Sequence, residues 1–268
     1  MTGQYVHGYQ AREGERLRDQ AGILTDLLHD GTAFPAGNVV LEAGCAVGAQ
    51  TVPLATRSPG ARFVAIDIAA ESVRLARQAV ADRGLANVAY AVADIFALPF
   101  RPASFDHIFV CFVLEHLSRP LDALVVLRAL LKPGGTITVI EGDHGSAYFH
   151  PDSEAAREAI RCQVALQRAA GGDALVGRKL YPLLAGAGLE EVHVSPRMVY
   201  VDASRPALVD GFTRKTFTAM IEGTRGAAVE AGLATAAAFD AGVRDLYRAA
   251  ESDGVFCYTF FKATAVVR

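Results

Sequence analysis

An apolar run that ends in an acid and two glycines constrains the possible fold more than any other feature of this 268-residue chain. The run covers residues 39–51 and reads VVLEAGCAVGAQT. Its first half is typical of a buried β-strand. Gly44 and Gly48 then allow a sharp turn and a close approach of the backbone to a ligand. A glycine loop between a strand and a helix is typical of a nucleotide-cofactor site, and a purely structural turn is the alternative.

Glu42 stands beside this loop and limits which ligand fits. A dinucleotide site receives a pyrophosphate at the N-terminus of a helix, where a neighbouring carboxylate would repel the phosphates. The same carboxylate attracts a cationic amino group. The loop also lacks the GxGxxG pattern of nicotinamide-binding proteins. The sequence therefore predicts a cofactor that presents an amino group, and no phosphate, to this loop.

Two further strand-like runs also end in acids. RFVAIDI (62–68) closes on Asp67, and VAYAVA (88–93) is followed by Asp94. Asp67 suits the two hydroxyls of a ribose, or alternatively caps the following helix. Asp94 suits the amino group of an adenine, with Ile95 against the ring face. Because ligands of open α/β sheets bind outside the carboxyl ends of the strands, these acids are predicted to converge on one crevice.

Strand-like and helix-like segments alternate along most of the chain, which predicts an α/β fold around a parallel sheet. The predicted strands cover residues 39–43, 62–68, 88–93, 105–112, 136–141, 191–201 and 255–267. The predicted helices cover residues 11–30, 48–57, 70–83, 119–131, 152–170 and 178–187, with more between 205 and 250.

An ordered set of motifs across roughly residues 35–145 resembles the class I S-adenosylmethionine-dependent methyltransferases. The set comprises VVLEAGCAVG, VAIDI, VADIFALPF, SFDHIFVCFVLEHL and LLKPGGTITVIEG. The resemblance implies a Rossmann-like sheet of seven mostly parallel strands, the last antiparallel, with helices on both faces. It also implies S-adenosyl-L-methionine as the cofactor and S-adenosyl-L-homocysteine as the product.

The same resemblance places the cofactor's methionine part near Glu42, its ribose near Asp67 and its adenine near Asp94. The expected cofactor-binding residues are Glu42, Gly44, Cys45, Gly48, Thr51, Asp67, Ile68, Asp94, Ile95, Phe112 and, from the N-terminal segment, Tyr9. For Tyr9, a position on the solvated surface of the N-terminal helix is the alternative.

Ala46 departs from the pattern, because the family usually has glycine at this position of the loop. If the position needs left-handed backbone geometry, an alanine there costs roughly 1–2 kcal/mol. We therefore expect a reduced affinity for the cofactor.

The chain is predicted to consist of an N-terminal helical segment (1–34) and one catalytic domain (35–268). Two stretches, about 143–177 and 203–253, are not needed to connect the seven strands of the expected sheet. They are expected to form helical lid insertions over the crevice. Aromatic side chains in and beside them suit an apolar or aromatic acceptor, although most such residues are simply core. The candidates for acceptor binding are Tyr148, Tyr181 and Phe217, together with Glu115 after the fourth strand.

His144 is the first candidate for a general base. It follows the fifth strand in the run EGDHG (141–145), where Asp143 or Glu141 can orient its ring. A loop histidine that binds only water is the alternative. His116 is the second candidate, with a structural role at the turn after the fourth strand as its alternative.

Composition narrows the class of partner. The formal charge of −3 and the pI of about 6.2 provide no basic field for nucleic acid, so a small acceptor is expected. The four cysteines never have CxxC spacing, so we predict neither a disulfide framework nor a metal site. No apolar leader or membrane-spanning run is present, which favours a cytoplasmic protein that does not bind membranes. A homo-oligomer is compatible with the sequence.

The sequence therefore favours methyl transfer from S-adenosyl-L-methionine to an O, N or C atom of a small metabolite of the natural-product type. Two alternatives stay open. One is an NAD(P)-dependent oxidoreductase, which shares the open sheet and an acid such as Asp67. The other is a protein that binds S-adenosylmethionine without methylating, to which Ala46 lends support.

Overall fold

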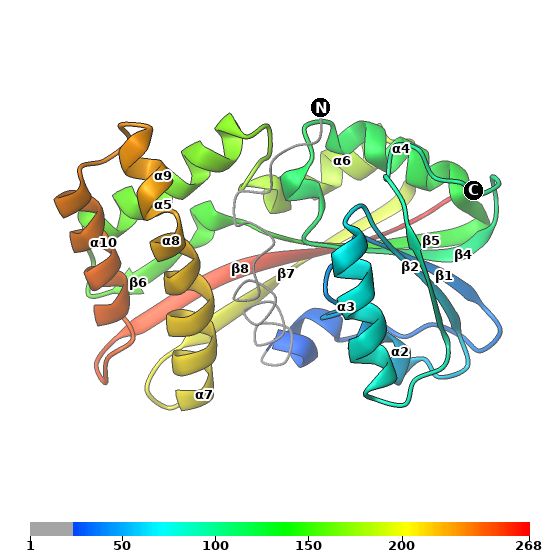
Figure 1. Ribbon diagram of the computed structural model, residues 1–268, viewed down its shortest axis with the longest axis horizontal. Coiled ribbons are helices and arrows are strands. Elements are labelled where there is room, and N and C mark those ends of the chain that lie inside the picture. The colour runs from blue at the N-terminus through cyan, green and yellow to red at the C-terminus, as the bar shows by residue number, and fades with distance from the viewer. Residues whose placement is uncertain (1–23) are drawn as a thin grey trace.

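The computed structural model describes residues 24–268, and its centre is a mixed sheet (Figure 1). Strands β1 to β5 pair in parallel in the order β3-β2-β1-β4-β5, and β8 joins β5 in antiparallel orientation. The strands are β1 (Val39–Ala43), β2 (Arg62–Asp67), β3 (Val88–Val92), β4 (Phe105–Cys111), β5 (Leu131–Gly142), β6 (Tyr148–His150), β7 (Glu190–Val201) and β8 (Val255–Val266). The predicted Rossmann-like α/β fold is confirmed.

Period-two alternation within the central strands sends neighbouring side chains to opposite faces of the sheet. In β1, Val40 packs in one buried cluster with Leu54 of helix α2 (Thr51–Arg57). Leu41 packs in another buried cluster with Leu127 of helix α4 (Pro120–Leu130). Helix α6 (Leu180–Gly186) adds side chains to the second cluster. Helices therefore cover both faces of the sheet, as predicted.

The prediction of seven strands is wrong, because the sheet contains an eighth, β6. β6 is three residues long and pairs with the start of β8, with Tyr148 opposite Cys257. A strand this short gives no periodic signal, and its partner lies far away along the chain. β5 also begins earlier than predicted, at Leu131, because the Pro133–Gly135 stretch interrupts its pairing with β4 without ending the strand.

The two predicted insertions gather around the β7–β8 ribbon, where it extends past the parallel strands (Figure 1). The first contains β6 and helix α5 (Glu154–Ala169). The second contains α7 (Pro206–Leu208), the π-helical segment η4 (Val209–Thr218), α8 (Ala219–Gly223), α9 (Arg225–Glu230) and α10 (Ala236–Arg248). Helices α5 and α10 approach so closely that a Cβ at Gly242 would lie 2.3 Å from the carbonyl oxygen of Ala155. The two insertions therefore pack as one unit.

The end of the N-terminal segment packs on the same body. Residues 24–29 are helical, and Leu24 and Leu28 are buried. The ammonium group of Lys262 on β8 donates to the carbonyl oxygen of Asp30 at 2.6 Å, just after this helix ends. Tyr9, for which we predicted a cofactor contact, lies outside the described residues. Within residues 24–268, no helix is both long and apolar enough to cross a membrane.

Candidate active site

The glycine loop after β1 has the backbone geometry that the sequence suggested. Gly44 and Gly48 have φ angles of 83° and 81°, and Ala46 between them has a φ of 43°. Close packing also requires glycine at position 48, because a Cβ there would lie 2.9 Å from the Cα of Ala76 in helix α3 (Ala70–Ala81). The left-handed geometry at Ala46 agrees with the expected strain.

Glu42 is almost fully buried at the carboxyl-terminal part of β1, with 2% of its surface exposed. Its Oε2 atom has no hydrogen-bond partner among the described residues. Burial, with a smaller contribution from the charge of Asp67, raises the pKa of Glu42 to about 7, and the Thr51 hydroxyl opposes this rise. An unpaired buried carboxylate oxygen in such a loop is costly unless a ligand satisfies it.

Asp67 fastens the glycine loop to the end of β2. Its Oδ2 accepts a hydrogen bond from the backbone N–H of Ala46, and its Oδ1 accepts one from Ala69, both at 2.9 Å. The N-cap residue of α3 is Ala69, so the alternative role of Asp67 as the helix N-cap does not hold. Burial raises the pKa of the Asp67 carboxyl. A carboxylate has about four acceptor sites, so Asp67 keeps acceptor capacity for a hydroxyl group.

The three acids lie at neighbouring strand ends. Ala43 of β1 pairs with Ile66 of β2, and Asp67 pairs with Val92 of β3. The Oδ1 of Asp94, just beyond β3, accepts from the backbone N–H of Phe96 at 2.9 Å, and this aspartate is exposed. Beside Asp67, Ile68 is 50% exposed, so an apolar surface lies open at the same edge. The three strand ends are therefore neighbours, and the convergence of the acids on one ligand crevice stays a prediction.

Glu115, His116 and His144 form a second group, which we call the Glu115 cluster. Glu115 and His116 lie in the short helix η1 (Leu114–His116) after β4, and His144 begins η2 (His144–Ser146) after β5. The Oε1 of Glu115 lies 3.6 Å from Nε2 of His116, and its Oε2 lies 3.9 Å from Nε2 of His144. The structure thus brings together both predicted bases and one predicted acceptor residue.

The acids expected to orient His144 have other partners. Both carboxylate oxygens of Asp143 accept hydrogen bonds from Arg178, and one also accepts from Gly145. The Oε1 of Glu141 accepts from the backbone N–H groups of Val113 at 2.9 Å and Leu114 at 2.7 Å. These carboxylates hold the loops around the site, and Glu115 is the acid that faces His144.

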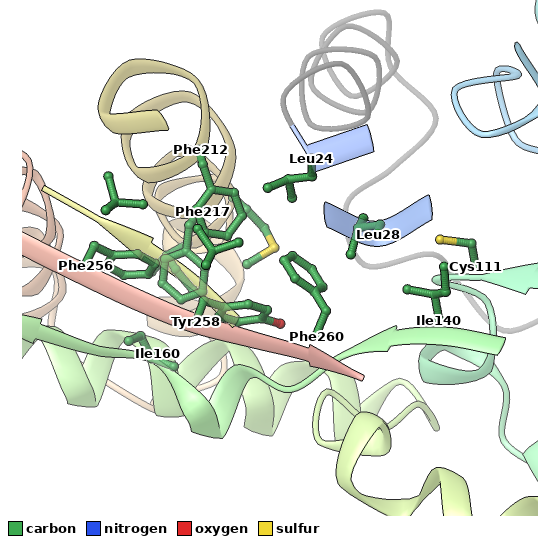
Figure 2. Packing of buried hydrophobic residues seen from close by; sticks show 14 of the residues in the cluster. Leu24, Leu28, Cys111, Ile140, Ile160, Phe212, Phe217, Phe256, Tyr258 and Phe260 are labelled. Atoms are coloured by element: carbon green, nitrogen blue, oxygen red, sulfur yellow. The ribbon is translucent and has the colours of Figure 1, made fainter. Parts of the chain in front are cut away.

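Sequence reasoning missed Tyr258 on β8. Its hydroxyl lies 3.3 Å from Nδ1 of His144, and the residue is 2% exposed. Its ring belongs to an aromatic cluster with Phe212, Phe217, Phe256 and Phe260, which joins η4 to β8 (Figure 2). The run VFCYTFF predicted only a strand, and no local spacing links it to His144.

Of the other predicted acceptor residues, only Phe217 lies beside the Glu115 cluster. The centre of its ring is 6.0 Å from that of His144. Tyr148 on β6 is 57% exposed, and its hydroxyl contacts the sulfur of Met198 at 3.7 Å. Tyr181 on α6 is 60% exposed. Acceptor contacts by Tyr148 and Tyr181 stay predictions.

All four cysteines, Cys45, Cys111, Cys162 and Cys257, are buried and free. Among residues 24–268, no three histidine, cysteine or acidic side chains are grouped so that they could hold a metal ion.

Part of the chain is similar to a known protein family. The family described as a methyltransferase domain matches residues 41–139. Over this range the chain is similar to methyltransferases. The matched range begins in β1 and ends in β5, so it contains the glycine loop, Asp67, Asp94 and Glu115.

A ubiquinone/menaquinone biosynthesis C-methyltransferase from Methylococcus capsulatus is 37% identical over 121 residues, which is 44% of this chain and 47% of that protein. The chain spans between 45% and 59% of the length of the first curated relatives that it matches.

Solved structures share the fold at low sequence identity. A phosphoethanolamine N-methyltransferase from Haemonchus contortus, in complex with phosphomonomethylethanolamine and S-adenosylhomocysteine, has a TM-score of 0.60 at 16% identity. The match covers 96% of this chain and 58% of that one. The [4+2]-cyclase SpnF has a TM-score of 0.58 at 20% identity, over 93% of this chain and 80% of that one.

Proposed function

We propose that this protein is a methyltransferase that uses S-adenosyl-L-methionine to methylate an O, N or C atom of a small acceptor. The observation that carries the proposal is the buried Glu42 carboxylate, whose Oε2 has no partner among the described residues and which stands at the glycine loop of a methyltransferase domain. Glu42 lies two residues before Gly44, so its carboxylate would stabilise a cationic amino group held at the glycine loop.

The residues around the loop fit an adenosyl sulfonium compound. Glu42 offers a carboxylate oxygen to an ammonium group, and Asp67 offers free acceptor sites to ribose hydroxyls. Asp94 and the exposed side chain of Ile68 offer an acid and an apolar surface to an adenine. No basic side chain is needed, which agrees with a cofactor that carries no phosphate.

When bound, S-adenosyl-L-methionine supplies a methyl group on a positively charged sulfur. The protein's own residues hold the acceptor in line with that methyl group, exclude water and remove a proton where the acceptor carries one. His144 is our candidate base, because it is buried and lies between the Tyr258 hydroxyl and the Glu115 carboxylate. A positioned base contributes roughly 10²–10⁴ in rate.

The acceptor is proposed to be a small apolar or aromatic metabolite of the natural-product type. The aromatic cluster of η4 and β8 lies directly beside His144 and supports this class. The C-methyltransferase among the relatives acts in ubiquinone/menaquinone biosynthesis, so a carbon acceptor belongs to the same proposal. We further propose a cytoplasmic enzyme that needs neither nucleic acid nor membrane.

Methyl transfer is tested by incubating the protein with methyl-labelled S-adenosyl-L-methionine and a bacterial metabolite extract, followed by mass spectrometry of labelled products. The proposal predicts a labelled small molecule whose yield falls roughly 10²–10⁴-fold in the His144→Ala variant. The binding affinity for the cofactor should change little, because His144 belongs to the acceptor side. Equal yields from the variant and the unmodified protein would remove His144 from the mechanism.

A protein that binds the cofactor without methylating is the second candidate. The fold similarity to a [4+2]-cyclase favours this candidate, and so does the left-handed Ala46 in the loop. Tight binding of S-adenosyl-L-methionine with no labelled product from any extract would support it over methyl transfer.

A further inference from the structure

Exposure to solvent rises stepwise through the Glu115 cluster. Tyr258 is 2% exposed, the side chain of His144 is 9% exposed, that of Glu115 is 13% exposed, and that of His116 is 23% exposed. Each of these side chains faces the next one. The distances are 3.3 Å from Tyr258 to His144, 3.9 Å from His144 to Glu115 and 3.6 Å from Glu115 to His116. The four side chains therefore connect a buried hydroxyl to the surface.

The buried end of this row is also connected to the turn after β4, which packs against the glycine loop. A Cβ at Gly44 would lie 2.3 Å from a side-chain carbon of Val113 in this turn. Phe112, directly after β4, has a φ of 56°, and its ring centre lies 5.5 Å from that of Phe260. Phe260 in turn lies 4.7 Å from Tyr258, and Tyr258 lies 5.8 Å from His144. An acceptor held between the loop and the aromatic cluster would thus lie at the buried end of the row.

Glu115 is fixed in the middle of the row by the first insertion. The side-chain amide of Gln167 on α5 donates to the Glu115 carbonyl oxygen at 3.0 Å and lies 3.2 Å from Oε2 of the Glu115 carboxylate. The backbone N–H of Asp173 donates to the same carbonyl oxygen at 2.7 Å. Gln167 is 1% exposed, so these bonds are shielded from competing water. The carboxylate is therefore held facing both imidazole rings.

We propose that Glu115 joins His144 and His116 into one proton path, which leads from the buried acceptor position beside Tyr258 to the surface at His116. This inference rests on the proposed methyltransferase function and deepens it by assigning the acceptor class. The acceptor is a neutral O–H or N–H group, which must lose its proton when it is methylated.

The path moves one proton per methyl group transferred. His144 accepts the acceptor's proton at Nδ1, the nitrogen that faces Tyr258, and releases the proton on Nε2 to Oε2 of Glu115. The Glu115 carboxyl group then rotates so that this proton faces His116 and passes it to Nε2, and His116 releases a proton to water. The two longer gaps exceed hydrogen-bond length, so each transfer needs a bridging water or a side-chain shift of about 1 Å. The acceptor keeps its electron pair for the new bond, and no oxidant or reductant is needed.

Other titratable groups face the row from the neighbouring elements. Glu141 on β5 is fully buried, and burial followed by the charge of Glu115 raises its pKa well above the usual range. Burial, followed by the charges of nearby carboxylates, also raises the pKa of the Cys111 thiol on β4. Asp143 is paired with Arg178, and Asp173 with Lys179. Burial therefore favours the neutral form of Glu141, Asp143 and Asp173 are paired with bases, and Glu115 is the carboxyl group that faces both histidines.

The electrostatic part of the proposal is tested by NMR titration of the histidine rings in the full chain without cofactor. His116→Gln and His144→Gln variants assign the two signals. If Glu115 faces both rings, Glu115→Gln should lower the pKa of each ring by roughly one unit. Glu158→Gln, on the exposed surface of α5, should move neither. If Glu115→Gln changed the pKa of only one of the two histidine rings, or of neither, the proposed proton path would be wrong.

Steady-state kinetics with the acceptor identified by the labelling experiment test whether His116 releases the proton to water. His116→Ala should lower kcat by about tenfold, less than the loss of the base itself, and free imidazole in the buffer should restore the rate. The KM for S-adenosyl-L-methionine should stay unchanged. An unaffected kcat, or a loss that imidazole does not repair, would refute the path while leaving methyl transfer intact. Absence of methyl transfer by the unmodified protein would instead refute the proposed function.

Discussion

The backbone N–H of Ala46 donates a hydrogen bond of 2.9 Å to the carboxylate of Asp67, so the glycine loop and the end of β2 form one unit. Ala46 makes this contact from left-handed geometry, with a φ of 43°. Replacement by glycine removes a strain of roughly 1–2 kcal/mol, while the extra freedom of glycine in the unfolded chain costs about 0.5–1 kcal/mol. We expect Ala46→Gly to raise the free energy of unfolding by up to about 1.5 kcal/mol in chemical denaturation.

Ala103→Gly is the matched control, because Ala103 has a φ of 54° and lies in the turn before β4, away from the loop. Both variants should become slightly more stable, and only Ala46→Gly should change the affinity for S-adenosyl-L-methionine. Equal affinities in the two variants would show that the alanine does not limit binding.

Asp67→Ala should weaken the binding of S-adenosyl-L-methionine. The variant loses charge-assisted hydrogen bonds worth roughly 1.5–3 kcal/mol, which corresponds to a dissociation constant about 10 to 150 times higher. Asp82→Ala, at the exposed C-terminal end of α3, is the control and should bind normally. Thermal unfolding of each variant separates a loss of ligand contacts from a loss of the loop itself. Unchanged affinity in a folded Asp67→Ala variant would place the ribose elsewhere.

Burial of Glu42 predicts that stability falls as the pH rises. The pKa of this carboxyl is about 7 in the folded protein and about 4.5 as an unperturbed group, so between these values the folded state binds more protons than the unfolded state. The free energy of unfolding therefore decreases with pH across this window, by on the order of 3 kcal/mol in total. Below about pH 4.5 the carboxyl is neutral in both states and contributes no penalty.

Glu42→Gln should abolish this contribution and gain stability relative to the unmodified protein at pH 8 but not at pH 4. Urea denaturation at a series of pH values measures the effect. In Glu71→Gln, at a fully exposed position on α3, the free energy of unfolding should fall with pH as it does in the unmodified protein. If the free energy of unfolding changed with pH in the same way for the unmodified protein and for Glu42→Gln, Glu42 would not be the source of the pH dependence.

Gly172→Ala should loosen the contact between the first insertion and the turn after β4. A Cβ at position 172 would lie 2.4 Å from the carbonyl oxygen of Glu115, a backbone atom that cannot move independently. We expect a loss of about 1–3 kcal/mol in stability and a fall in methyl transfer, because Gln167 and Glu115 separate. Gly226→Ala on α9, where nothing lies within 4 Å, should be neutral or gain about 0.5–1 kcal/mol. Similar stabilities of the two variants would contradict the tight contact.

Local patterns in the sequence predicted the fold well where the interactions are local. The apolar runs of β1 to β4 and their acids were identified because each strand and its glycine or aspartate are adjacent in the chain. The unpredicted parts depend on long-range pairing. β6 is a strand because it pairs with β8, with Tyr148 opposite Cys257. The contact between Tyr258 and His144 also joins segments that are far apart in the sequence.

The candidate site was predicted in part for the same reason. His144, His116 and Glu115 were chosen from their positions after strands, and the sheet order brings them together. The partner of His144 was not predictable, since Asp143 and Glu141 are its sequence neighbours but are held by Arg178 and by the backbone of Val113 and Leu114. Gln167 carries no sequence signal, because it is one of two glutamines on α5 and acquires its role only from packing.

The most direct test of the central claim is isothermal titration calorimetry of the full chain with S-adenosyl-L-methionine and, separately, with NAD. The claim that Glu42, Asp67 and Asp94 together bind an adenosyl sulfonium compound predicts saturable one-to-one heat with S-adenosyl-L-methionine and none with NAD. Binding of NAD alone, or no heat with S-adenosyl-L-methionine, would contradict it.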